Sequence, residues 1–353
     1  NGNISAMLWN NTVNSEQQRG YDFSYDHLER LTEANYGESG NLSVNRTRYD
    51  EKMSYDVMGN MTSLYRNGLQ DDHVYGTIDN LTYTYNGNHL QSVSDAADGP
   101  CYQGAFHFKD GSSTNVEYEY DRNGNMTKDL NKGISKIEYN LLNLPSKIIH
   151  KDGNMEQYTY SADGSKLSVT YGINITAIAV PMTKVMNNTS TSLLTGNSSK
   201  DNILDEQKRT VFYCGNVIYD RDTTRILTDE GYITFNGTNP VYHYYLKDHL
   251  GNNRIVMNAD GTIEQASHYY PFGGLFGEST NSSAQPYKYN GKELDRTNGL
   301  DFYDYGARNY DAALAKWITV DPLCEKYVDT SPYVYCGNNP INAFDPDGRI
   351  IIF

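Results

Sequence analysis

The chain has 353 residues, enough for one large or two ordinary domains and for a sizeable buried core. Its formal net charge is −15, with acidic and basic residues scattered along the chain as on a solvated surface. This balance disfavours nucleic acids and anionic membranes as partners, because both need a basic surface. The sequence has no apolar run of about 18 residues, so no transmembrane segment is predicted.

The residue types favour strands and tight turns. Tyrosine occurs 32 times and glycine 30 times, and the mean hydropathy is −0.69. Tyrosine favours strands and combines a large apolar ring with a polar tip, whereas Gly, Asn and Asp favour turns. The composition therefore predicts an all-β protein whose strands carry aromatic faces.

The four cysteines do not predict a metal site or a cofactor. They form no CxxC pair and no Cys/His cluster with metal-ligand spacing, and no glycine-rich phosphate loop opens a helix. Cys324 and Cys336 could form a disulfide in an oxidising compartment. Free thiols packed as small hydrophobic groups are equally consistent with the sequence.

An internal repeat decides the predicted fold. Six segments share an alternating strand that ends in Tyr, a polar turn, and a second short strand, as in "YDFSYDHLERL", "SYDVMGNMTSLY", "TYTYNGNHLQSV", "VEYEYDRNGNMTKDL", "IEYNLLNLPSKI" and "QYTYSADGSKLSV". In "VEYEY" the period of two places Val116, Tyr118 and Tyr120 on one face. A single hairpin is marginally stable, so the units must stack to bury their rings. The opening "NGNISAMLW" matches the second half of a unit, and we expect the chain to be a segment of something longer.

These units resemble the tyrosine-aspartate (YD, or Rhs) repeat, of the form Y-D-x-x-G-R-L. The resemblance implies that residues 1–175 form stacked β-hairpins within a sheet that spirals into a hollow shell. Residues 176–240 are interpreted as an irregular insertion rich in Ser, Thr and Asn, followed by lead-in strands similar to those of members from Bacteroides-like bacteria.

From residue 241 the turn signals come closer together. We expect strands separated by turns at "DHLGN" and "NADG", a hairpin with Asn-Gly at its tip at "DRTNG", and one short helical turn in "YDAALAKW", where Ala and Leu cluster. Residues 241–349 resemble the Rhs repeat-associated core domain through "DHLGN", "YYPFG", "GLDFYDYGARNYD", "WITVDP", "YVYCGNNP" and "DPDG". Residues 350–353 are interpreted as the start or remnant of a variable C-terminal region.

The resemblance also implies a site. In that family the core domain closes the shell, and in studied members it cuts its own chain after a D-P-x-G-L motif, with a pair of carboxylates and an arginine. Transferred to this sequence, the catalytic residues are Arg308, Asp321 and, as the second carboxylate, Asp345. The family's Leu is replaced here by Arg349, and the expected cut lies at Gly348–Arg349 or Arg349–Ile350, just after Asp347.

The chemistry is intelligible from the residue types. Two close carboxylates do not both ionise readily, so one can activate water while the other donates a proton. A nearby guanidinium can hold one of them in its charged form. The alternative interpretation is structural: Asp-Pro commonly opens a turn, and an arginine such as Arg308 can pack its stem against Tyr rings.

Two functional hypotheses follow. In the first, the chain is the shell segment of a bacterial Rhs polymorphic toxin, secreted or at the cell surface. It would enclose a C-terminal toxin for competition between bacteria and cleave itself once. Its partners would be that toxin, the N-terminal remainder of the parent chain, and an immunity protein or secretion apparatus. In the second, the chain is a cell-surface adhesion protein whose exposed Tyr faces bind glycans. A glycoside hydrolase has no other carboxylate pair to support it.

Overall fold

A computed structural model describes residues 2–10, 18–97, 101–102, 104–172 and 208–353, and almost all of its regular structure is β-sheet. Within each of the three sheets, every strand pairs in antiparallel fashion with its neighbours along the chain, so each sheet is a meander. The predicted all-β fold of stacked hairpins is confirmed. Of the insertion and lead-in strands predicted for 176–240, residues 176–207 lie outside the described residues.

Two sheets form a curved wall. The first has seven strands: β1 (Ala6–Trp9), β2 (Arg19–Tyr25), β3 (Leu31–Glu38), β4 (Glu51–Tyr55), β5 (Met61–Asp71), β6 (Val74–Asn86) and β7 (His89–Asp95). The second has thirteen: β8 (Tyr118–Tyr120), β9 (Met126–Asp129), β10 (Ile134–Tyr139), β11 (Pro145–His150), β12 (Met155–Tyr160), β13 (Lys166–Gly172), β14 (Arg209–Cys214), β15 (Val217–Asp220), β16 (Thr223–Thr228), β17 (Gly231–Asn236), β18 (Asn239–Lys247), β19 (Asn253–Asn258) and β20 (Ile263–Ala266).

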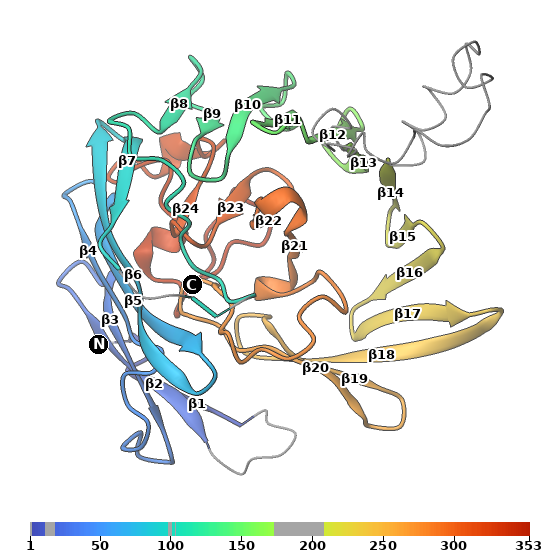
Figure 1. The fold of residues 1–353 in the computed structure, drawn as a ribbon, viewed down its shortest axis with the longest axis horizontal. Coiled ribbons are helices and arrows are strands. Elements are labelled where there is room, and N and C mark those ends of the chain that lie inside the picture. Colours follow the sequence, from blue (N-terminus) through green and yellow to red (C-terminus); the bar gives the residue numbers. More distant parts are fainter. Residues whose placement is uncertain (1, 11–17, 98–100, 103, 173–207) are drawn as a thin grey trace, which may run out of the picture.

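The remaining chain lies inside the curve of this wall (Figure 1). It contains a small sheet and short 3₁₀ turns: β21 (Glu293–Asp295), β22 (Phe302–Asp304), β23 (Asn309–Asp311), β24 (Lys316–Trp317), η3 (Tyr289–Gly291), η4 (Thr297–Gly299), η5 (Cys324–Lys326) and η6 (Cys336–Asn338). The hairpin predicted at "DRTNG" is the β21–β22 pair. The predicted helical turn in "YDAALAKW" is wrong, because Ala312–Ala315 form a tight turn between β23 and β24, with Ala315 at a left-handed φ of 57°. We call residues 268–345 the inner segment.

The repeated aspartate organises each turn. The Asp56 Oδ1 atom accepts hydrogen bonds from the amides of Met58 and Asn60, at 2.9 and 2.8 Å. The carboxylates of Asp26, Asp121 and Asp248 make the same pair of contacts, to the amides two and four residues later, and so does the amide oxygen of Asn140. The turn is therefore kept in repeats whose sequence has diverged, since the Asn side chain supplies the same acceptor oxygen as Asp.

The repeated tyrosine joins successive units. Its hydroxyl donates to a backbone carbonyl of the preceding unit in four pairs: Tyr25 to Ile4 (2.7 Å), Tyr55 to Leu31 (2.6 Å), Tyr139 to Met126 (2.5 Å) and Tyr160 to Pro145 (2.9 Å). The rings of Tyr25, Tyr55 and Tyr139 also pack against the main hydrophobic core. A ring that buries apolar area and satisfies its polar tip explains why tyrosine recurs at this position.

The core lies between the wall and the inner segment. Tyr49, in the connection between β3 and β4, stacks on Phe276 of the inner segment with ring centroids 3.8 Å apart. Within the inner segment, Tyr310 stacks on Tyr335 at 4.1 Å. All four cysteines are free thiols, and Cys336 is buried. The described residues contain no helix whose length and hydropathy would allow it to span a bilayer. Across the same residues, no group of three or more His, Cys, Asp or Glu side chains is arranged to hold a metal ion.

A buried ionic group fixes the inner segment to the wall. Arg66 on β5 is ion-paired with Glu51 at 2.6 Å and with Asp79 at 3.1 Å, and all three side chains are essentially inaccessible. Its two terminal nitrogens also donate to the carbonyls of Ala312 and Ala313, each at 2.9 Å. Burial alone would lower the pKa of Arg66, but the two carboxylates outweigh it and raise that pKa.

We predict that Arg66→Met destabilises the chain by about 3–5 kcal/mol, because it leaves two buried carboxylates and two buried carbonyls without their donor. Urea unfolding followed by tyrosine and tryptophan fluorescence measures the loss. The exposed Arg122 gives the control, since Arg122→Met should change the free energy of unfolding by no more than about 0.5 kcal/mol. Equal losses in the two variants would contradict the role assigned to Arg66.

Candidate functional site

Arg308 is the centre of the predicted site. It precedes β23 in the tight turn after β22, where the Tyr305 amide donates to the Arg308 carbonyl at 3.0 Å. The guanidinium carbon lies 4.0 Å from the ring centroid of Trp317 on β24. The side chain is 1% exposed, so stacking and burial hold the guanidinium in one position.

Both predicted carboxylates meet this guanidinium. The Arg308 Nη2 atom lies 3.0 Å from the Asp321 Oδ2 atom and 3.1 Å from the Asp345 Oδ2 atom. Asp321 follows "WITV" and Asp345 opens "DPDG", and both side chains are buried. The three predicted residues therefore come together around one nitrogen atom.

The second oxygen of Asp345 organises the turn that follows it. The Oδ1 atom accepts hydrogen bonds from the amides of Asp347 at 3.1 Å, Gly348 at 2.7 Å and Arg349 at 3.1 Å. Every one of these partners is a donor, as is Arg308 on the other oxygen. Asp345 thus stabilises the turn through one oxygen and pairs with Arg308 through the other. The sequence left open whether this aspartate belongs to a turn or to an arginine–carboxylate site, and it belongs to both.

Gly348 is the closest backbone contact of the site. Its carbonyl accepts a hydrogen bond from the Arg308 Nε atom at 2.6 Å. It adopts a left-handed φ of +78°, and a Cβ atom placed on it would lie 2.9 Å from the Arg308 amide nitrogen. Both the conformation and the close approach require glycine here.

The peptide bond between Gly348 and Arg349 is therefore held at both ends. Its carbonyl oxygen contacts the guanidinium of Arg308, and its amide hydrogen points to the carboxylate of Asp345. A cation against the carbonyl stabilises negative charge that develops on oxygen, and a carboxyl group beside the nitrogen is in position to exchange a proton with it.

Burial alters the acidity of the site. It raises the pKa of the Asp321 carboxyl above its ordinary value, and the nearby charge of Asp345 adds to that effect while Arg308 opposes it. Burial also lowers the pKa of the Arg308 guanidinium, against the opposing effect of Asp321 and Asp345. The site thus contains one carboxyl group that holds its proton more readily than an ordinary aspartate.

The other predicted residues line the turn. The Asp347 carbonyl accepts from the Ala307 amide at 3.1 Å, and its side chain accepts from the Arg349 amide at 3.0 Å. The side chains of Arg349 and Ile350 are exposed, so Arg349 does not fill a pocket. Beyond them, Ile352 pairs with Phe344 in a short antiparallel bridge, through amide-to-carbonyl contacts of 2.9 and 3.0 Å.

Two residues of the site were not predicted from the sequence. Trp317 forms the wall on which Arg308 stacks, and Lys292 donates from its Nζ atom to the Pro346 carbonyl at 2.6 Å. Trp317 stands in the motif "WITVDP", where its proximity to Asp321 was a usable signal. Lys292 gave no signal, because its contact joins residues that are 54 positions apart.

The fold and the site together define a wall of stacked YD-type hairpins around an inner segment with an arginine–carboxylate site. Residues 217–341 match the family model described as the teneurin YD-shell. The chain is 31% identical over 245 residues to salivary gland surface protein 1 of Aedes aegypti, covering 66% of this chain and 7% of that protein. It is 31% identical over 115 residues to toxin subunit YenC1 of Yersinia entomophaga, covering 31% of this chain and 11% of that one.

A third relative and two solved structures extend the comparison. The chain is 25% identical over 310 residues to the tRNA3(Ser)-specific nuclease WapA of Bacillus spizizenii, covering 80% of this chain and 11% of that protein. Crystal structures of TcdB2-TccC3-TEV, and of TcdB2-TccC3 without its hypervariable C-terminal region, align with 94% of this chain and 18% of theirs. Their TM-scores are 0.46 and 0.45, at 17% and 19% identity. The sequence matches support the resemblance to YD-shell and Rhs proteins, and the chain spans about a tenth or less of the curated relatives' length.

We predict that Asp321→Asn changes the pH dependence of stability. Because the folded-state pKa of Asp321 is raised, the folded protein loses stability at this group as pH rises through that pKa. The variant lacks this loss, so its free energy of unfolding should improve relative to the wild type between pH 4 and pH 7. Urea unfolding at both pH values measures the difference.

Asp163 supplies a control of opposite sign. Hydrogen bonds from Ser161 and Ser165 lower the pKa of this exposed carboxyl to about 2, so its contribution is present at neutral pH and is lost as pH falls. Asp163→Asn should therefore lose stability relative to the wild type as pH rises from 2 to 4, with a nearly constant difference from pH 4 to pH 7. The same sign in both variants would show that Asp321 does not have a raised pKa.

Proposed function

We propose that the chain is the C-terminal shell segment of a YD-repeat toxin, and that it helps to enclose a cargo continuous with its own C-terminus. The carrying observation is that the wall curves around residues 268–345, which lie on its concave side (Figure 1). Tyrosines of the wall region, such as Tyr36 and Tyr49, and of the inner segment, such as Tyr270, are buried in one common core. The relative named as toxin subunit YenC1 supports a role in a toxin.

The division of the chain belongs to this proposal. Residues 1–175 would be repeat wall, 176–240 an insertion with lead-in strands, 241–349 an Rhs-type core domain, and 350–353 the beginning of a variable region. The parent protein would be bacterial, and secreted or at the cell surface. Its partners would be the cargo, the N-terminal remainder of the parent chain, and an immunity protein or secretion apparatus.

The site would perform one self-cleavage. Asp345 in its ionised form would take a proton from a water molecule, whose oxygen adds to the Gly348 carbonyl carbon. Arg308, 2.6 Å from the carbonyl oxygen, would stabilise the oxyanion. Asp345, whose Oδ1 atom lies 3.1 Å from the Arg349 nitrogen, would pass the proton to that nitrogen when the carbon–nitrogen bond breaks. Asp321, 3.0 Å from the Arg308 Nη2 atom, would hold the guanidinium in place beside the carbonyl. The bond is tethered in place by folding, so the proximity is built into the chain.

The contacts favour Gly348–Arg349 as the scissile bond over Arg349–Ile350. Both polar atoms of the first peptide contact the site, through the Gly348 carbonyl and the Arg349 amide. Arg349 itself is exposed, so the contacts of the site to this residue are to its backbone. The replacement of the family's Leu by Arg349 is therefore compatible with cleavage.

We predict that the chain, expressed with a C-terminal tag, releases the tag with residue 349 as its first residue. Asp321→Asn and Asp345→Asn should each keep the tag attached, because the first removes a charge that holds Arg308 in place and the second removes the base. Intact-mass analysis under denaturing conditions measures the cleaved fraction and locates the cut.

Two variants serve as controls. Asp347→Asn keeps the acceptor oxygen of the turn, and Arg349→Leu alters only an exposed side chain, so both should cleave as the wild type does. Release of the tag from Asp321→Asn at the wild-type rate would overturn the assigned site. An uncleaved wild-type chain would leave these residues with a structural role only.

A second function has one supporting observation. On the face of the second sheet opposite the one that carries buried Val211 and Ile218, five aromatic rings are 42–51% exposed: Phe212, Tyr219, Phe235, Tyr242 and Tyr244. Exposed rings of this kind suit a cell-surface adhesion protein that stacks on glycans. The relative named as a surface protein is consistent with this function.

Protection of a C-terminal segment from protease distinguishes a shell from an adhesion protein. If the parent chain is a shell, a C-terminal segment should resist added protease in the native parent protein and be digested once urea unfolds the wall. Gel analysis against time measures the protection. Immediate digestion of the native protein, together with glycan binding that Tyr242→Ala and Tyr244→Ala abolish, would favour adhesion instead.

A further inference from the structure

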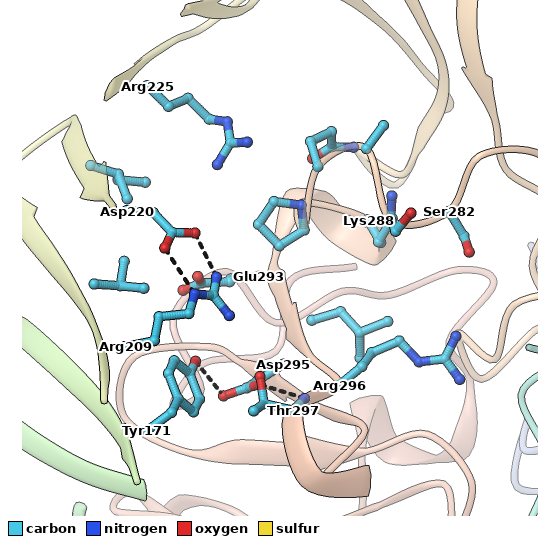
Figure 2. A pocket seen from close by; sticks show the side chains of 17 residues that line it. Tyr171, Arg209, Asp220, Arg225, Ser282, Lys288, Glu293, Asp295, Arg296 and Thr297 are labelled. Atoms are coloured by element: carbon cyan, nitrogen blue, oxygen red, sulfur yellow. Dashed lines mark hydrogen bonds and ion pairs between the residues drawn. The ribbon is translucent and has the colours of Figure 1, made fainter. Parts of the chain in front are cut away.

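A cavity of about 260 Å³ lies between the wall and the inner segment, away from Arg308. One side is formed by β13–β16 and the other by the loop that leads into β21, as Figure 2 shows. Its apolar lining includes Val211 and Ile218 from the wall and Pro286 and Leu294 from the loop. The cavity thus has an apolar surface as well as a set of charged groups.

Each acidic side chain of the cavity already has partners. Both oxygens of Asp220 are bound by Arg209, at 2.8 and 2.5 Å. The Asp295 carboxylate accepts from the Tyr171 hydroxyl and the Thr297 amide, each at 2.9 Å. Glu293 accepts from Lys166 and from the hydroxyl of Tyr213, both at 2.8 Å.

Two basic side chains of the same cavity each have a buried nitrogen atom without such a partner among the described residues. Lys288 is only 1% exposed, and its Nζ atom has no hydrogen-bond partner among the described residues. The Nε atom of Arg225 is likewise buried and unpartnered within the described chain. In Figure 2, Arg225 extends from its strand into the space facing the loop that carries Lys288. Buried donors without acceptors are costly, so their persistence here points to a bound acceptor.

We propose that this cavity binds a small organic anion, with its oxyanion group on Lys288 and Arg225 and its apolar part against Val211, Ile218, Pro286 and Leu294. A carboxylate or phosphate group supplies the acceptors that these donors lack. The cavity is larger than such a group alone requires, and the apolar walls fit a short hydrocarbon or aromatic body.

The charges around Lys288 make this binding dependent on pH. Arg209, Arg225, Arg296 and Lys288 line the cavity together with Asp220, Glu293 and Asp295. Burial, with Arg296 and Arg225 nearby, lowers the pKa of Lys288 to about 7. Lys288 is charged below that pH and neutral above it, so the affinity for an anion should fall as pH rises from 6 to 8.5.

Isothermal titration calorimetry of the 353-residue chain tests the proposal, with benzoate as the anion and benzyl alcohol as its uncharged counterpart. At pH 6 benzoate should bind, and Lys288→Met should weaken it by about tenfold or more, the loss expected for a charge-assisted hydrogen bond. Lys136→Met, at a surface lysine whose side chain is 60% exposed, is the matched control and should leave the affinity unchanged.

Each outcome decides the proposal. Benzoate that binds more tightly than benzyl alcohol, and that loses affinity between pH 6 and 8.5 in the wild type but not in Lys288→Met, supports it. Equal binding of the two probes, or equal affinity in the wild type and Lys288→Met, overturns it, as does the absence of binding by benzoate. Thermal unfolding shows whether Lys288→Met is correctly folded. This variant should melt no lower than the wild type, because it removes a buried amine that has no hydrogen-bond partner among the described residues. If Lys288→Met does melt lower, the same titrations are made with Arg225→Met.

Discussion

The buried contact between Arg66 and the carbonyls of Ala312 and Ala313 is the interaction on which the rest of the structure depends. A curved sheet of hairpins has one face that must be covered, and the inner segment covers it. Apolar packing alone would allow that segment to shift along the wall. A guanidinium held by Glu51 and Asp79 has fixed donor directions, so it sets the position of the turn between β23 and β24.

That position determines the candidate site. Arg308 immediately precedes β23, and Trp317, on which it stacks, lies on β24. The two ends of the turn held by Arg66 therefore carry the guanidinium and its aromatic support. The carboxylates arrive later in the chain, in turns that need aspartate for their own hydrogen bonds. One set of residues thus stabilises the fold and supplies the chemistry.

Short-range patterns predicted the wall well. Strand alternation and Asp-, Asn- and Gly-rich turns are local properties, and they led to the correct all-β fold even where Asn140 replaces the aspartate. The "YDAALAKW" prediction failed because alanine favours helices, whereas a left-handed residue at Ala315 and the grip of Arg66 favour a turn. Arg66 itself gave no signal, since a charged strand residue normally faces solvent and its partners are 246 and 247 positions away. The meeting of Arg308 with two aspartates came from the resemblance to a family, because no periodicity connects them.

The bridge between Phe344 and Ile352 would hold the two chain ends together after cleavage of the Gly348–Arg349 bond. It joins a residue before the Gly348–Arg349 bond to one after it, through two backbone hydrogen bonds. Hydrolysis of that bond would give two chains that remain paired, much as a nicked strand stays in its sheet. The C-terminal piece would then leave only when this pairing also opens, so separation of the two pieces would be a second step that follows hydrolysis.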